Sequence, residues 1–272
     1  MVLQTVSLDA TMNSLTDFSQ ISGLKINADK TYVHKLGSLL TNNDHIETTN
    51  QLNWTDNPLC TLGIKIPIGN MKDIFNMNYI PQIEQMEINF KQWNKRKMSL
   101  RGKVTIIKTY GTSKLVYLAA ILPNPPQLII NKINQLIFKF LWNDTEDKIK
   151  RDIMVSSLER GGLAVPHFQT ICQSQKIAWV KRYSSSDENC QWGKMVRNIL
   201  ESLGGDLIFK TNLNDGHMKY LVLKSSFWKD VLTCWCLFNY ANNINNNEIL
   251  SQIIWLNSNV RVETSPYTIC LV

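Results

Sequence analysis

The stretch SLRGKVTIIKTYGTSKLVYLAAIL, residues 99–122, repeats apolar residues at steps of three and four. This spacing places the apolar side chains on one face of an α-helix. Ser99 is suited to cap the first turn, because its hydroxyl can accept a hydrogen bond from an N–H group that lacks a partner within the helix. Pro123 would end the helix. The predicted apolar stripe consists of Leu100, Val104, Ile107, Gly111, Leu115, Leu118 and Leu122.

Helical spacing also occurs on both sides of this stretch, with shorter strand-like runs before it. The further predicted helices cover residues 3–20, about 78–98, 127–142 and 169–183. The predicted strands are a strand–turn–strand at 24–36 and a hairpin within 52–68. We therefore expect an α+β fold that is mainly helical. It would comprise a small α/β hairpin unit at 1–70, a helical region at 71–185 and a mostly helical region at 186–272.

Basic residues are concentrated in one acid-free stretch. Between Glu87 and Asp144 there are ten lysines and arginines and no acidic residue, while the rest of the chain has 19 basic (29 − 10) and 22 acidic residues. The formal charge of +7 is thus a local property. A basic surface on a nearly neutral chain indicates a polyanionic partner, with nucleic acid the first candidate.

Composition also bears on the compartment of the cell. No apolar run approaches the ~20 residues that a membrane-spanning helix needs, and residues 1–10 lack the basic and apolar segments of a secretory signal. The six cysteines are scattered, which is typical of reduced thiols. We expect an intracellular protein, in the cytoplasm or nucleus, with no membrane partner.

The string FSQISGLKINADKT, residues 18–31, is the most specific motif in the chain. It resembles F-x-x-x-S-G-L-x-x-N-x-x-K-[ST], which follows the catalytic aspartates in reverse transcriptases of non-LTR (LINE-type) retrotransposons. Other blocks match that family in the same order: LGIKI from 62, SLRGKV from 99, FLW from 140, GGLAVP from 161 and WLN from 255.

The resemblance implies the end of a polymerase palm, then a thumb and a post-thumb region. Leu62, Gly63 and Ile64 would belong to the hairpin that grips the primer end. Lys30 would lie near the phosphates of the incoming nucleotide; the alternative is a solvated lysine in a turn.

The chain departs from that family at the catalytic centre. Family members carry an aromatic-Ala-Asp-Asp box, whose carboxylates help to hold two metal ions for nucleotide transfer. No Asp-Asp pair occurs in this sequence. We therefore expect no catalytic residue, metal site or cofactor in this chain, and Mg²⁺ only in an intact family member. A missing N-terminal polymerase portion would be needed for polymerisation.

Four cations of the acid-free stretch are predicted to contact phosphates: Lys97, Arg101, Lys103 and Lys108. Arg101 and Lys108 are seven residues apart and would share one helix face. The expected ligand is a template–primer duplex, an RNA–DNA hybrid. The alternative is an ordinary soluble helix face, although such faces normally mix Glu with Lys.

Two other interpretations of the whole chain stay open at this point. It could be the product of a decayed retrotransposon without a biochemical role. It could also be a helical protein-interaction module whose basic face binds acidic protein.

Overall fold

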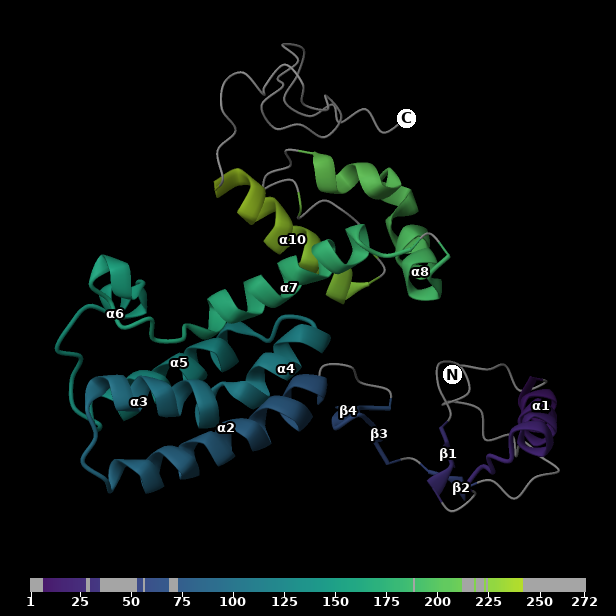
Figure 1. The fold of residues 1–272 in the computed structure, drawn as a ribbon, viewed down its shortest axis with the longest axis horizontal. Helices are drawn as coiled ribbons and strands as arrows, with labels where there is room; N and C mark the ends of the chain where they lie inside the picture. The colour runs from purple at the N-terminus through teal and green to yellow at the C-terminus, as the bar shows by residue number, and fades with distance from the viewer. Residues whose placement is uncertain are drawn as a thin grey trace, which may run out of the picture. The chain divides into compact units, whose positions relative to one another are not determined.

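The computed structural model describes residues 7–27, 30–34, 53–55, 57–68, 73–187, 189–211, 218, 223 and 225–241. Over these residues the protein is mainly helical with two small sheets, which confirms the predicted α+β class (Figure 1). The chain divides into two compact units, Met1–Pro81 and Gln82–Val272.

The first unit begins with helix α1, Ser7–Ser22, as predicted. Gly23 ends it in the left-handed conformation (φ 72°), and its N–H donates to the Ser19 carbonyl at 3.0 Å. Glycine suits this cap because it has no Cβ to clash. The apolar side of α1 is largely exposed, with Ile21 at 89%.

The strands of the first unit form two pairs. They are β1 (Tyr32–Val33) and β2 (Asn53–Trp54), which are parallel, and β3 (Leu59–Thr61) and β4 (Ile64–Ile66), which are antiparallel. The β3–β4 hairpin confirms the prediction for 52–68. Leu62 and Gly63 form its turn with φ values of 49° and 78°, as a type I′ turn requires. The side-chain amide of Asn78 accepts from the Lys65 N–H at 2.9 Å and donates to the Lys65 carbonyl at 2.7 Å, which holds β4 in place.

The strand predicted at Leu24–Ile26 was wrong, since this segment forms no strand. The Asn27 side chain accepts a hydrogen bond from the Lys30 N–H at 3.2 Å, so the backbone turns locally. The second predicted strand is present as β1, while residues 35 and 36 lie outside the described residues.

The second unit is helical where it is described. Its main helices are α2 (Asp73–Asn94, which starts in the first unit), α3 (Leu100–Ile106), α4 (Ser113–Ile121), α5 (Gln127–Leu141), α6 (Arg151–Val155), α7 (Phe168–Ser184), α8 (Gln191–Leu200) and α10 (Ser226–Ala241). Short 3₁₀ turns cover Leu158–Arg160, Glu201–Leu203 and Gly205–Lys210. Helix α2 starts earlier than predicted, so Pro81 lies inside the helix and not in its first turn.

The single helix predicted over 99–122 is interrupted. Ser99 caps α3 as predicted, with its hydroxyl accepting from the Gly102 N–H at 3.2 Å. A π-helical turn at Ile107–Gly111, hereafter the π-turn, then separates α3 from α4. It ends with the Thr112 N–H donating to the Ile107 carbonyl at 2.8 Å, five residues back. The predicted stripe is buried, except that Leu100 is exposed.

Helix α7 connects the helices of the second unit. It packs against α4, α5 and α10, and α10 lies across it in Figure 1. A hydrophobic cluster joins Val180 and Tyr183 of α7 to Val231 and Leu232 of α10. The predicted boundary near 185 therefore does not separate cores, because residues on both sides of it share this cluster. No helix among the described residues is both long enough and apolar enough to span a membrane.

Candidate nucleic-acid interface

The ten cations of the acid-free stretch divide into nine exposed side chains and one buried one. The exposed ones are Lys91, Lys95, Arg96, Lys97, Arg101, Lys108, Lys114, Lys132 and Lys139. Among the described residues, only Lys91 of this set has an ion-pair partner, with its ammonium 2.8 Å from the Glu87 carboxylate. That bond raises the pKa of Lys91 and lowers the pKa of Glu87. The other exposed cations have no carboxylate at ion-pair distance within the described part of the chain.

Three of these cations lie on or beside α3, and we call Lys97, Arg101 and Lys108 the cationic surface. Arg101 is in the first turn of α3, and Lys108 is in the π-turn. Both are exposed, as is Thr105 between them, which agrees with a shared solvent face. Lys97 precedes the cap residue Ser99 and therefore lies off the end of α3, because α2 and α3 are separate helices.

Hydroxyl groups run along the same side of α3 and the π-turn. Thr109 donates to the Thr105 carbonyl at 2.9 Å, and Ser113 donates to the Thr109 carbonyl at 2.7 Å. Such bonds from Ser and Thr hydroxyls to carbonyls four residues earlier often bend a helix. Here they flank the π-turn that carries Lys108.

The prediction that Lys103 contacts phosphate was wrong. Its side chain is only 3% exposed. The ammonium donates to the Phe140 carbonyl at 2.6 Å, to Asn94 at 3.2 Å and to the side-chain oxygen of Asn143. Burial lowers its pKa. Because its donors are used inside the helical bundle, Lys103 fixes the end of α5 to α3 and does not belong to the cationic surface.

The predicted primer-grip residues form the tip of the β3–β4 hairpin in the first unit. Leu62 is 86% exposed at the tip, whereas Ile64 is buried. Gly63 occupies a left-handed position that a residue with a Cβ would strain. The turn of the hairpin thus presents the Leu62 side chain to solvent.

Lys30 lies on the exposed turn that follows Asn27, as both of its sequence-based interpretations require. Its backbone N–H donates to the Asn27 side chain, and this bond is compatible both with a phosphate contact and with a solvated lysine. The role of Lys30 stays a prediction.

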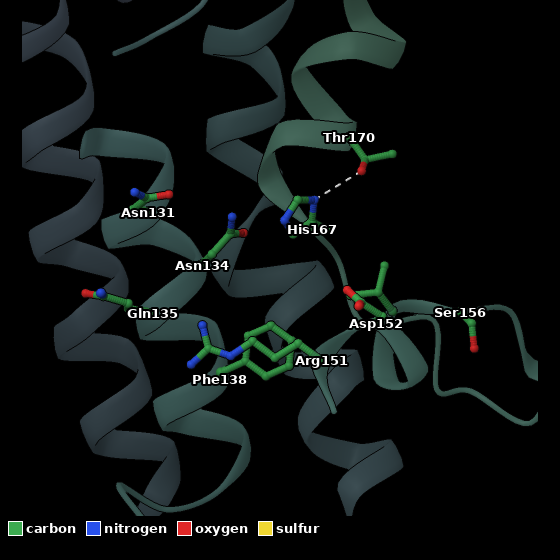
Figure 2. A pocket seen from close by; sticks show the side chains of 10 residues that line it. Asn131, Asn134, Gln135, Phe138, Arg151, Asp152, Ser156, His167 and Thr170 are labelled. Carbon is green, nitrogen blue, oxygen red and sulfur yellow. Dashed lines mark hydrogen bonds between the residues drawn. The ribbon is translucent and has the colours of Figure 1, made fainter. Parts of the chain in front are cut away.

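A polar hollow of 540 Å³ between α5, α6 and α7 was not foreseen from the sequence (Figure 2). Arg151 lies over the Phe138 ring at 4.7 Å and pairs with Asp147 at 2.6 Å. His167 bonds to Thr170 at 3.1 Å, and Asn134 accepts from the Phe168 N–H at 2.9 Å. Asn134 therefore connects α5 to the start of α7, and Arg151 connects α6 to Phe138 of α5.

The described residues were also compared with the needs of a metal site and of a thiol nucleophile. No cluster of three His, Cys, Asp or Glu side chains that could hold a metal occurs among the described residues. Cys172 and Cys234 are buried, and burial raises the pKa of Cys172 to about 12. A thiol with so high a pKa is a poor nucleophile at neutral pH.

No protein-family model matches this chain. The likeness to LINE-type reverse transcriptases consequently rests on the sequence blocks quoted above.

Proposed function

We propose that this chain binds a nucleic-acid duplex through the cationic surface, as the palm-end, thumb and post-thumb part of a LINE-type reverse transcriptase. The preferred ligand is the RNA–DNA hybrid of a template and its primer. The observation that carries the proposal is the exposure of Lys97, Arg101 and Lys108 with no carboxylate at ion-pair distance among the described residues. Cations without partners favour phosphate contacts, which select no sequence.

The test is the salt dependence of binding to a fluorescent RNA–DNA hybrid, measured by anisotropy. Each phosphate contact adds roughly 0.9 to the slope of log K against log salt, so three contacts contribute about 2.7. The triple variant K97E/R101E/K108E should bind much more weakly and with a shallower slope. The matched control is K181E/K194E/K210E, which reverses three exposed lysines outside the acid-free stretch.

Equal losses in the two triple variants would mean that only total charge matters, and the proposal would be abandoned. Binding of acidic polypeptide but not of the hybrid, lost only in the first variant, would instead identify a protein-interaction module. Affinity that does not change with salt would refute phosphate binding.

We further propose that the predicted primer-grip hairpin contacts the primer strand through its tip, Leu62 and Gly63, while the buried Ile64 anchors that tip. The exposed Leu62 side chain on a fixed turn supports this role. Leu62→Ala should weaken binding of a hybrid with a recessed primer end while leaving the salt slope unchanged. Equal binding by the variant and the natural chain would remove the hairpin from the interface.

We do not propose that this chain alone transfers nucleotides. Two-metal chemistry needs carboxylates that hold both ions, and the sequence has no Asp-Asp pair. Purified chain with Mg²⁺, hybrid and deoxynucleotides should leave the primer at its original length. Extension by the purified chain would overturn this part of the proposal.

A further inference from the structure

An aromatic pair lies close in sequence to the cationic residues of the second unit, with Trp93 four residues before Lys97 and Tyr110 two residues after Lys108. Trp93, near the end of α2, and Tyr110, in the π-turn, have ring centroids 5.6 Å apart and ring planes inclined at 42°. The guanidinium of Arg96 lies over the Trp93 ring at 4.6 Å. We call these three residues the aromatic platform. Tyr110 remains 54% exposed, so part of its ring is accessible to a ligand.

The π-turn is held against the core beneath the platform. A Cβ on Gly111 would lie 2.7 Å from the Phe90 ring, so only glycine allows this close approach. Phe90 in turn stacks on Phe140, with centroids 4.3 Å apart. Because Gly111 is fixed by this contact, the preceding residue, Tyr110, is carried on backbone with a defined geometry. π-Helical turns within α-helices are often found at functional sites.

The charge around the platform favours an anionic, planar ligand. Arg96 and Lys97 follow Trp93 within four residues, and the platform lies wholly within the acid-free stretch. An aromatic ring and a guanidinium plane are the groups on which unpaired bases stack. A duplex buries its base faces in its own stack, so the exposed part of the Tyr110 ring suits a base that lies outside the duplex.

We infer that the aromatic platform stacks an unpaired nucleobase in a single-stranded extension of the duplex that the cationic surface holds. This inference rests on the proposed function, and it names the form of the nucleic acid: a hybrid with a short single-stranded end. The phosphates bind Lys97 and its neighbours, while the first unpaired base lies against Tyr110.

The experiment compares a blunt hybrid with the same hybrid carrying a short single-stranded extension, at either end in turn. The natural chain should prefer one extended form. Tyr110→Ala should bind that form about tenfold more weakly and leave the blunt hybrid unaffected, since stacking adds affinity only where a base is free. Tyr110→Phe should retain the preference because it keeps the ring. The salt slope should be the same for all three proteins.

The matched control is Phe238→Ala. Phe238 is also an exposed aromatic residue, at 44%, and its ring is 5.8 Å from that of Trp235, but it lies on α10 outside the acid-free stretch. Its removal should not change either affinity. A second measurement needs no variant: 2-aminopurine as the first unpaired base should lose fluorescence when the natural chain binds.

Equal affinity of the natural chain for blunt and extended hybrids, or unchanged 2-aminopurine fluorescence, would overturn the inference. So would equal weakening of both hybrids by Tyr110→Ala. The proposed function fails separately, if reversal of the cationic surface leaves blunt-hybrid binding intact.

Discussion

The solvent side of α3 and the interior of the helical bundle use the same kind of side chain in opposite ways. Outside, Arg101 and Lys108 extend into solvent without an acidic partner among the described residues. Inside, Lys103 and Lys176 are buried, and each ammonium donates to carbonyls at the end of another helix. A basic composition therefore does not tell which cations are available to a ligand.

Lys176 is more completely buried than Lys103. Its ammonium donates to the Ala119 carbonyl at 2.6 Å and to the Leu122 carbonyl at 2.7 Å, at the end of α4. It also lies over the Phe227 ring at 4.8 Å. Cations stabilise the carbonyl end of a helix because they satisfy its unpaired acceptors and its dipole.

The largest effect should come from Lys176→Met, which sharpens the contrast between interior and exterior lysines. Removal of the ammonium leaves two buried carbonyls without their donor, which should lower the free energy of unfolding by about 3 kcal/mol. Urea denaturation followed by tryptophan fluorescence measures this. Lys181→Met, an exposed lysine on the same helix, is the control and should change stability by less than about 0.5 kcal/mol. Equal effects would show that burial does not distinguish the two lysines.

Lys103→Met should have the next largest effect. We expect a loss of about 2 kcal/mol in unfolding free energy, since the Phe140 carbonyl and the Asn143 side chain lose their shared donor. Hybrid binding by the folded variant should keep its salt slope. Lys108→Met should do the reverse, with a shallower slope and nearly unchanged stability. If Lys103→Met instead reduced the salt slope of hybrid binding, Lys103 would have to be counted among the phosphate contacts.

Gly111→Ala tests whether the close contact with Phe90 holds the π-turn. The added methyl group must displace a ring packed in the core, which should cost about 1–3 kcal/mol of unfolding free energy. Phe90→Leu in the same chain should relieve the clash, so the double variant should lose less stability than the sum of the single changes. Additive losses would contradict the direct contact.

The smallest effect should be the pH dependence contributed by Asp230. Burial raises the pKa of this carboxyl, while its bond to the Asn124 N–H at 2.7 Å and the charge of Lys176 act in the opposite sense. The folded state therefore holds this proton more tightly than the unfolded state. The stabilisation is complete below the ordinary pKa of 3.8 and is lost as pH rises through the higher folded value. Asp230→Asn should remove this decline from stability curves measured at several pH values. An unchanged curve would show that another titrating group causes the decline.

Much of the fold follows from local sequence signals. The helices α1, α5 and α7 and the hairpin of β3 and β4 were predicted from periodicity and turn residues. The π-turn was not, because it depends on Gly111 meeting Phe90, a residue of another helix. Pro81 suggested a late start for α2, yet the helix begins at Asp73.

The candidate site was predicted in part. Exposure of Arg101 and Lys108 agrees with their predicted shared face, which lies beside the apolar stripe and not within it. The burial of Lys103 could not be derived in the same way, because two of its three acceptors come from residues 37 and 40 positions further along the chain. The pairing of Tyr110 with Trp93 is likewise a tertiary contact. The sequence alone indicated only that aromatic residues occur within the acid-free stretch.

The two interior lysines also bear on how the chain assembles. Lys103 joins a position 37 residues away, and Lys176 joins one 57 residues away. Contacts that distant in sequence raise contact order and slow folding, since the loop between them must close first. Neither ammonium can reach its carbonyls until the helices have docked. An isotopic label on either side chain would therefore report the assembly of the bundle, not the formation of any single helix.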